Sequence, residues 1–256
     1  ADIMICDVNP INSSDFQKTK YFIAPLTNPD HITNLSPYQE LIDLRSHVTK
    51  LKNVKSTAEL TIMLALMLLR RQKEPCRRWN RYDYLGKTLN GKKVGIIGYG
   101  RIGRTVETLF QSFGCTTMFI DPMYWSPDTR MNIIQSSDII TIHASFYATK
   151  ENYYNFQIRD TDIANMKRGV FLINTARPCF DEDIIYKNAS FFGGVAIDVM
   201  YGEPHPPKFN KLRELPNVII TPHIGGCTIE DLTRTSEICY ELLKLRMAEN
   251  DNTVKS

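Results

Sequence analysis

The stretch Val94–Gly103, "VGIIGYGRIG", is an apolar run that leads into three spaced glycines. Such spacing marks a dinucleotide-binding turn when a strand precedes it, a helix follows it and an acidic residue lies about twenty positions on. The following segment, "RIGRTVETLFQSFG", has helical periodicity, and Asp121 ends the next strand-like run, "TTMFID". All three conditions are met, so the sequence predicts a dinucleotide site here.

Each residue of the turn has a predicted task. Gly98 permits the tight turn, Gly100 lets the backbone approach a pyrophosphate, and Gly103 allows close packing of helix on strand. The helix beginning near Arg101 and Ile102 offers unpaired N–H groups and the positive end of its dipole to the phosphates. We therefore expect these five residues to contact the cofactor.

Asp121 also predicts which dinucleotide binds. A carboxylate there accepts hydrogen bonds from ribose hydroxyls and repels a 2′-phosphate, and no Arg or Lys follows until Arg130, so NAD is favoured over NADP. His143, at the end of the run "ITIH", is a further candidate for a contact near the adenosine. A structural role at the end of its strand is the alternative.

The chain around this turn is organised as an α/β protein. From Lys92 onward, short apolar runs alternate with amphipathic ones, and the polar "TRMNIIQS" lies between the second and third of them. This pattern predicts a Rossmann domain, a doubly wound parallel sheet of six strands between about Leu89 and Pro222. Three earlier strand-like runs, "ADIMICD", "YFIAPL" and "LIDLRS", predict a smaller α/β unit. We assign 74–227 to the NAD-binding domain, and 1–73 with 228–256 to a substrate domain with inter-domain helices.

Composition excludes several classes of protein. The 256 residues carry a net charge of only +3, which argues against a nucleic-acid partner, and the basic run 70–82 is interpreted as a solvated helix end and linker. The longest apolar run, Leu60–Leu69, is too short to span a bilayer, so no membrane contact is expected. Six scattered cysteines without metal-ligand spacing predict reduced thiols, no metal site and a cytoplasmic protein.

Polar side chains follow the last three predicted strands. Arg177 follows "VFLIN", Glu203 follows "GGVAID", and His223 follows "NVIIT". The carboxyl ends of parallel strands meet at one edge, where ligands bind. A guanidinium that grips a carboxylate and an imidazole held by a carboxylate suit hydride transfer to a small 2-oxo acid. Asp198, at the end of its strand, could accept a hydrogen bond from a nicotinamide carboxamide, and a role as a helix or turn cap is the alternative.

These segments resemble the D-isomer-specific 2-hydroxyacid dehydrogenases, a family that includes proteins like phosphoglycerate dehydrogenase. The motifs that carry the resemblance are "KKVGIIGYGRIGRTV", "FIDP", "MKRGVFLINTAR", "GGVAIDVMYGEP" and "LPNVIITPHIGG", in the family's order, and upstream "STAELTIMLALMLLRR" and "APLTNPDHI". The resemblance covers nearly all of residues 21–228.

The resemblance implies roles for the matching residues. Arg177 would bind the substrate carboxylate, and His223, with Glu203 as its partner, would be the general acid in reduction and the general base in oxidation. The residues implied near the nicotinamide are Thr175, Ala176 and Asp198, and those implied to offer backbone contacts to the substrate are Thr27 and Asn28. Family members commonly dimerise through the cofactor domain, so a homodimer is implied.

The sequence departs from the family pattern in its small domain and in two loops. The first strand and helix of the family's flavodoxin-like substrate domain should precede "ADIMICD", and this sequence has no counterpart of them. The substrate domain is therefore predicted to be shortened at its N-terminus. Pro178 stands where a glycine is usual, and Asn28-Pro29 replaces a glycine-containing turn. The leading hypothesis is an NAD-dependent enzyme that interconverts a small D-2-hydroxy acid and its 2-oxo acid. The alternatives are an NAD(H)-responsive, corepressor-like binding protein and an inactive truncated dehydrogenase.

Overall fold

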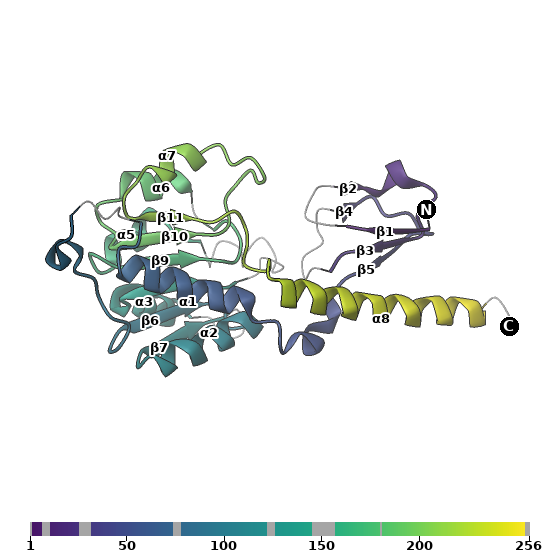
Figure 1. Ribbon diagram of the computed structural model, residues 1–256, viewed down its shortest axis with the longest axis horizontal. Helices are drawn as coiled ribbons and strands as arrows, with labels where there is room; N and C mark the ends of the chain where they lie inside the picture. Colours follow the sequence, from purple (N-terminus) through teal and green to yellow (C-terminus); the bar gives the residue numbers. More distant parts are fainter. Residues whose placement is uncertain are drawn as a thin grey trace. The chain divides into compact units, whose positions relative to one another are not determined.

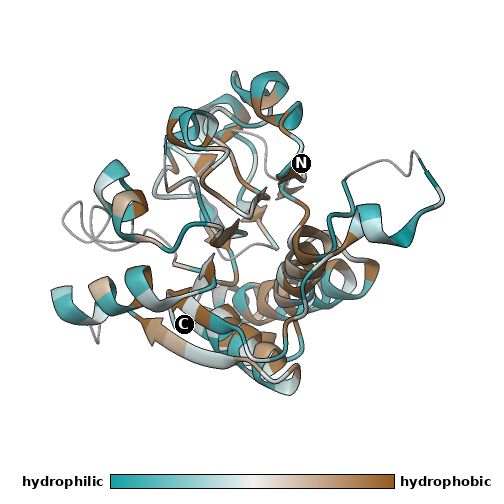
Figure 2. Ribbon diagram, turned by 90° about the vertical axis from the view of Figure 1, so that its left-hand side faces the viewer, coloured by the Kyte–Doolittle hydropathy of each residue, from teal (hydrophilic) through white to brown (hydrophobic). Residues whose placement is uncertain are grey.

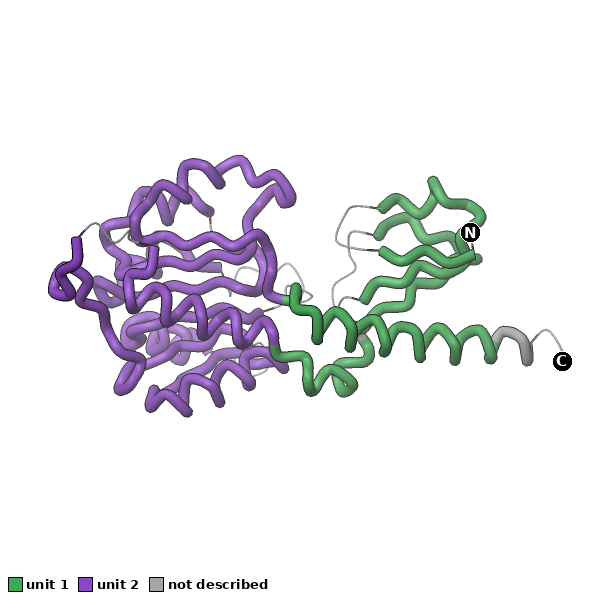
Figure 3. Tube along the Cα trace, in the orientation of Figure 1, with its two compact units in different colours: residues 1–55, 226–256 green, residues 56–225 purple. Residues whose placement is uncertain are grey.

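The structure is a computed structural model that describes residues 2–6, 11–25, 32–73, 78–121, 126–144, 157–179 and 181–253. The chain divides into two compact units (Figure 3). Residues 1–55 and 226–256 form the smaller unit, and residues 56–225 form the larger one.

A six-stranded parallel sheet forms the centre of the larger unit (Figure 1). Its strands are β6 (Lys93–Ile97), β7 (Thr116–Ile120), β8 (Ile139–Ile142), β9 (Phe171–Asn174), β10 (Gly194–Ile197) and β11 (Val218–Ile220). They lie in the order β11-β10-β9-β8-β6-β7. The middle strands β8, β9 and β10 are buried along their whole length, as expected of parallel strands covered on both faces. The predicted doubly wound fold is confirmed.

Helices cover both faces of this sheet. On one face, α1 (Ser56–Leu69) packs against β9 and β10, and α2 (Arg101–Ser112) packs against β6, β7 and α1. The other face is covered by α3 (Pro127–Ser136), α5 (Asp160–Asn165) and α6 (Glu182–Lys187), and α7 (Phe209–Arg213) packs beside β11 and α6. Successive residues of a strand point to opposite faces of the sheet. Ile96 therefore packs with α1 and α2, and Ile97 packs with α3. The short helices and turns at the surface are mostly hydrophilic (Figure 2).

The helix α1 belongs to the compact unit of the sheet. It buries Leu64, Leu68 and Leu69 in the same core as Val94 and Ile96. The unit therefore begins at Ser56, whereas the domain limits drawn from the sequence group this helix with the substrate domain. The difference arises because a helix rich in apolar residues packs on the face that buries most of its apolar surface, whichever domain it leads from.

The helix α3 lies where the sequence analysis found only a polar stretch. Ser126 caps it, because its Oγ accepts a hydrogen bond from the Thr129 amide at 3.0 Å, and Pro127 occupies the first turn. Only Ile133 and Ile134 are buried, side by side in the sequence. Two adjacent buried residues give too weak a periodic signal to predict a helix, so the cap is the informative feature.

The smaller unit contains two short parallel sheets and one long helix. The first sheet has the order β1 (Ile3–Ile5), β3 (Tyr21–Ile23), β5 (Glu40–Ile42), and β2 (Ile11–Asn12) pairs with β4 (Ile32–Thr33). Short 3₁₀ helices span Ser13–Phe16 and Arg45–Leu51. The helix α8 (Ile229–Thr253) contributes Ile238, Cys239 and Leu243 to a core that includes Tyr21 and Leu44. Among the described residues, no helix is long and apolar enough to cross a membrane.

Candidate active site

The candidate site lies along the carboxyl ends of the strands in the larger unit. The strand β6 pairs with β7 on one side and with β8 on the other, so the strand order reverses there. Ligands of open parallel sheets bind at such a reversal, beyond the carboxyl ends of the strands. The glycine turn leaves β6 at this point.

The three glycines of the turn are required for different reasons. Gly98 has a φ of +94°, and a Cβ on it would lie 2.3 Å from the Ala144 amide nitrogen. A Cβ on Gly103 would lie 2.1 Å from the Gly98 carbonyl oxygen. At Gly100, by contrast, a Cβ would meet no atom within 4 Å. The backbone is therefore open at Gly100, where a pyrophosphate needs close approach. At Gly98 and Gly103 the surroundings are crowded, and glycine is required there by the packing of the fold.

The start of α2 is suited to an anion. Gly100 is its N-cap and provides no side-chain cap, and the first turn holds no acidic residue. The amides of Arg101, Ile102 and Gly103 therefore lie at a positive helix end without a carboxylate in that turn. This cradle fits the diphosphate of a dinucleotide.

Asp121 directly follows β7, as the sequence predicts. Its Oδ2 accepts a hydrogen bond from the backbone N–H of Tyr99 at 2.8 Å. The Tyr99 ring stacks on Phe119 with 3.6 Å between centroids. The carboxylate is thus held beside the glycine turn, where a ribose would lie.

His143 is buried and takes part in a chain of hydrogen bonds. Its Nε2 lies 2.9 Å from Thr141 Oγ1, and its Nδ1 lies 3.4 Å from Thr175 Oγ1. Burial lowers the pKa of His143 to about 3, so the ring is neutral near pH 7. The side chain is only 8% exposed, and Thr175 links it to the loop that precedes Arg177. A direct contact with the cofactor stays a prediction.

The loops after β10 and β11 bring Glu203 and His223 together. Glu203 Oε2 lies 2.6 Å from His223 Nδ1, and Glu203 Oε1 accepts a hydrogen bond from the Met200 amide, also at 2.6 Å. The backbone of His223 is left-handed, with a φ of +55°, a conformation in which histidine is enriched among non-glycine residues. Glu203 therefore orients the His223 imidazole through Nδ1, and the Met200 amide in turn orients the Glu203 carboxylate.

The charge of Glu203 depends on its neighbours. Burial alone would raise the pKa of this carboxyl, but the hydrogen bonds from His223 and Met200 outweigh it. The positive charges of His223 and Arg177 act in the same direction, and the pKa of Glu203 is lowered overall. The structure thus pairs Glu203 with His223, and the place of Arg177 in the same site stays a prediction that its effect on the pKa of Glu203 supports.

Asp198 holds the loop that carries His223. Its carboxylate accepts hydrogen bonds from Thr221 Oγ1 at 2.5 Å and from the amides of Ile224 and Gly225 at 2.9 Å each. Burial raises the pKa of Asp198, although these three hydrogen bonds oppose the change. These contacts are of the kind expected from the alternative role of Asp198 as a turn cap, and its contact with the nicotinamide stays a prediction.

Asn174 is a second bracing residue, and sequence reasoning missed it. It ends β9, is fully buried, and its side-chain amide donates to the Arg177 carbonyl at 2.8 Å. Its Oδ1 accepts from the Ala176 amide at 3.1 Å, while Arg177 Nη1 donates to the Ala176 carbonyl at 2.6 Å. A single amide thus fixes the loop of Thr175, Ala176 and Arg177. The available signal was a polar residue at the end of an otherwise apolar strand.

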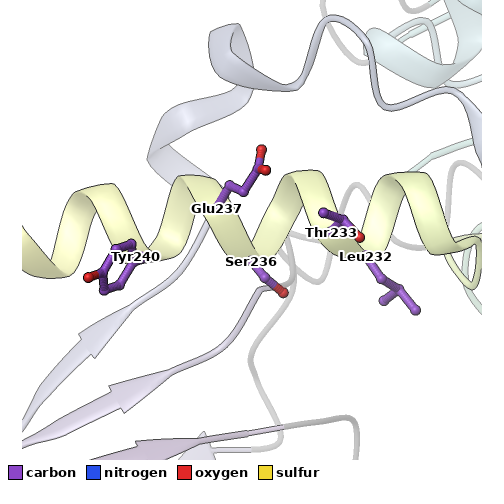
Figure 4. A pocket seen from close by; sticks show the side chains of 5 residues that line it. All are labelled: Leu232, Thr233, Ser236, Glu237 and Tyr240. Atoms are coloured by element: carbon purple, nitrogen blue, oxygen red, sulfur yellow. The ribbon is translucent and has the colours of Figure 1, made fainter.

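Two predicted substrate contacts, Thr27 and Asn28, lie outside the described residues. A wide, open hollow of about 550 Å³ lies elsewhere, on α8, lined by Leu232, Thr233, Ser236, Glu237 and Tyr240 (Figure 4). It contains none of the predicted site residues. In the described ranges, no group of three or more His, Cys, Asp or Glu side chains is arranged to hold a metal ion.

Known proteins are similar to this chain both in sequence and in fold. Residues 62–225 match the family model described as "D-isomer specific 2-hydroxyacid dehydrogenase, NAD binding domain". A glyoxylate reductase of Thermofilum pendens is 32% identical over 205 residues, which are 72% of this chain and 59% of that protein. A D-3-phosphoglycerate dehydrogenase of Bacillus subtilis is 34% identical over 75% of this chain and 39% of its own length. The chain thus spans less than two thirds of the length of each of these relatives.

Solved structures agree. A D-lactate dehydrogenase of Aquifex aeolicus, solved in complex with NAD and lactic acid, is 25% identical and has a TM-score of 0.77, with all of this chain and 85% of that one covered. NAD, the cofactor expected from the glycine turn, is therefore also the cofactor named in the matching domain model and the one bound in the Aquifex aeolicus structure. This chain belongs to the D-isomer-specific 2-hydroxyacid dehydrogenase family and carries that family's NAD-binding domain.

Proposed function

We propose that this protein is an NAD-dependent oxidoreductase that interconverts a small D-2-hydroxy acid and its 2-oxo acid. The observation that carries the proposal is the contact of 2.6 Å between His223 Nδ1 and Glu203 Oε2, on the edge of the sheet from which the glycine turn also projects. An imidazole oriented by a carboxylate is the arrangement that proton transfer to a carbonyl requires.

Each residue has a defined task in the reduction. Arg177 binds the substrate carboxylate with its guanidinium and polarises the 2-oxo group. His223, held through Nδ1, donates a proton from Nε2 to the carbonyl oxygen as the C–H bond forms at C2. Glu203 stabilises the charged imidazole before the transfer. In the oxidation the same atoms run in reverse, with His223 removing the hydroxyl proton.

NADH supplies the hydride when it is bound. The residues that would hold its diphosphate are those of the cradle at the start of α2, Gly98, Gly100, Arg101, Ile102 and Gly103. Asp121 would accept hydrogen bonds from the ribose hydroxyls, and His143 would lie near the adenosine end of the cofactor. Thr175, Ala176 and Asp198 would lie near the nicotinamide.

Substrate contacts, assembly and location follow the same proposal. Thr27 and Asn28 would contact the substrate carboxylate through their backbone. Exposed aromatic side chains support a homodimer through the larger unit, since Trp79 is fully exposed and Tyr82 is 65% exposed, and large apolar groups of this kind favour an interface. We propose a cytoplasmic location, which the free, buried thiols of Cys115, Cys179 and Cys239 support.

The test is NADH oxidation, followed at 340 nm, against glyoxylate, pyruvate, hydroxypyruvate, phosphohydroxypyruvate and a branched-chain 2-oxo acid. We expect turnover with at least one acid. His223→Ala should lower kcat by about 100- to 10,000-fold, the usual contribution of a general acid, while NADH binding measured by fluorescence is retained. Bound NADH without turnover on any acid of the panel would contradict the proposal.

A further inference from the structure

Two threonines of α1 contact the loops that carry the proposed catalytic residues. Thr57 Oγ1 donates to the Gly225 carbonyl at 2.9 Å, two residues after His223. Thr61 Oγ1 lies 3.0 Å from Thr175 Oγ1, two residues before Arg177. The two threonines are four positions apart and therefore lie on one face of the helix.

The contact of Thr57 completes the hold on Gly225. The Gly225 amide donates to Asp198 at 2.9 Å, and its carbonyl accepts from Thr57. Gly225 leaves little room for a side chain, because a Cβ would lie 3.0 Å from Asp198 Oδ2 and 3.2 Å from Thr57 Cγ2. The loop after His223 is therefore clamped between the sheet and α1.

The contact of Thr61 begins a chain of hydrogen bonds with a defined direction. Thr61 Oγ1 donates to the Thr57 carbonyl at 2.8 Å, so it accepts the proton of Thr175. Thr175 Oγ1 then accepts from His143 Nδ1 at 3.4 Å, which leaves His143 Nε2 to accept from Thr141 Oγ1 at 2.9 Å. A hydroxyl has only one proton to donate, so this order fixes His143 in the tautomer with a proton on Nδ1.

The groups in this chain of hydrogen bonds are buried, so a change at one of them affects the next. Thr61 and Thr141 are fully buried, and Thr175 and His143 are 6% and 8% exposed. Water does not replace a partner easily at such depth, so loss of one hydroxyl leaves the next group unsatisfied. A change at Thr61 should therefore reach Thr175, and through it the loop of Arg177.

We propose that Thr57 and Thr61 are positioning residues, a pair of hydroxyls on one face of α1 that hold the Arg177 and His223 loops in the relative placement that the reaction needs. The inference rests on the proposed function, because it is that reaction which needs the guanidinium and the imidazole on one substrate. It adds α1 to the site, although no residue of α1 is given a part in the chemistry.

The test uses the full-length chain with Thr57→Val and Thr61→Val, which keep the shape and remove the hydroxyl, and with Thr57→Ser and Thr61→Ser, which restore it. Thr108→Val is the matched control, because Thr108 Oγ1 also donates to a carbonyl four residues earlier, on the exposed side of α2. Each valine variant should lower kcat on the order of 10- to 100-fold, as expected for misplaced reacting groups. The serine variants and Thr108→Val should keep the wild-type kcat.

NADH affinity and the histidine NMR spectra separate positioning from folding and from the proposed reaction. NADH affinity should change less than about threefold, since a loss confined to the transition state leaves ground-state binding intact. Imidazole ¹⁵N spectra should show the His143 signals shifted in Thr61→Val and the His223 signals shifted in Thr57→Val, with both restored by serine. If the wild type turns over no acid, the proposed function fails and these spectra alone decide. Histidine signals that stay unmoved in both valine variants, or wild-type kcat in both, would overturn the positioning role.

Discussion

Nδ1 of His223 and Oε2 of Glu203 lie 2.6 Å apart, although the two residues are 20 positions apart in the chain. The contact joins the loop after β10 to the loop after β11. Each side is anchored independently, Glu203 by the Met200 amide and the His223 backbone by the Asp198 carbonyl, which accepts from the His223 amide at 2.9 Å. The pair is therefore held in place by hydrogen bonds of the protein itself, which reduces the reorganisation that the reaction requires.

Replacement of Glu203 by glutamine tests what the charge of the pair contributes. Glu203→Gln keeps the size of the side chain but removes the negative charge beside His223. We expect kcat to fall on the order of 100-fold, within the range for general acid–base catalysis, with the KM for NADH little changed. Steady-state kinetics of NADH oxidation measure both values.

The matched control is Glu214→Gln, which removes one exposed carboxylate at the end of α7. It should retain the wild-type kcat. Because the pKa of Glu203 is lowered, this carboxyl stays ionised down to and below the ordinary glutamate range, so the difference between the variants should persist from pH 8 to pH 5. Equal rates for Glu203→Gln and wild type would refute the role of the charge.

Substitutions in the glycine turn should separate cofactor binding from folding. Gly100→Ala places its methyl group where no protein atom lies within 4 Å, so the fold should tolerate it with a loss of at most about 1 kcal/mol, the usual size of an N-cap effect. The same methyl would occupy the space of the diphosphate. We expect NADH affinity, measured by fluorescence titration, to fall at least about tenfold.

Gly103→Ala provides the contrasting case. Its methyl group would lie 2.1 Å from the Gly98 carbonyl oxygen, so the loss should be in stability, measured as a lowered midpoint of thermal unfolding. Gly226→Ala, also at an open position, should change neither property. The assignment of the diphosphate to Gly100 would be wrong if Gly100→Ala bound NADH like the wild type.

Local signals were sufficient to predict the sheet. All six strands are short apolar runs bounded by polar or glycine-containing segments, and a parallel strand such as β8 needs no long-range information to be identified. The positions of Arg177, Glu203 and His223 followed from one topological rule, because residues after parallel strands meet at one edge. This rule brings loops together but assigns no hydrogen bonds.

The bracing contacts depend on distances that no pattern in the sequence encodes. Asn174 reads as the last residue of a strand, and nothing in the spacing shows that its amide closes the Arg177 loop. Thr57 looks like a helix cap, yet its hydroxyl binds a carbonyl 168 positions away. Asp198 was assigned to the cofactor because the carboxylate lies at a strand end, but its three hydrogen bonds to the His223 loop become visible only in three dimensions.

The buried histidine predicts a pH dependence of stability. Burial lowers the pKa of His143 from 6.5 to about 3, so the unfolded chain binds a proton in this interval and the folded chain does not. Stability is therefore unaffected by His143 above about pH 6.5 and is lost progressively as the pH falls below it. Between pH 7 and pH 5 this single group should cost about 2 kcal/mol.

Urea unfolding at pH 7, 6 and 5 measures this loss, in a range above the ordinary pKa values of carboxyl groups. His143→Gln keeps a neutral polar side chain beside Thr141 and Thr175 and should remove most of the slope. His205→Gln removes an exposed histidine instead and should keep it. A wild-type slope in His143→Gln would mean that the ring is protonated without penalty in the folded protein. The directed chain from Thr61 to Thr141 would then be wrong as well, because it requires Nε2 to accept.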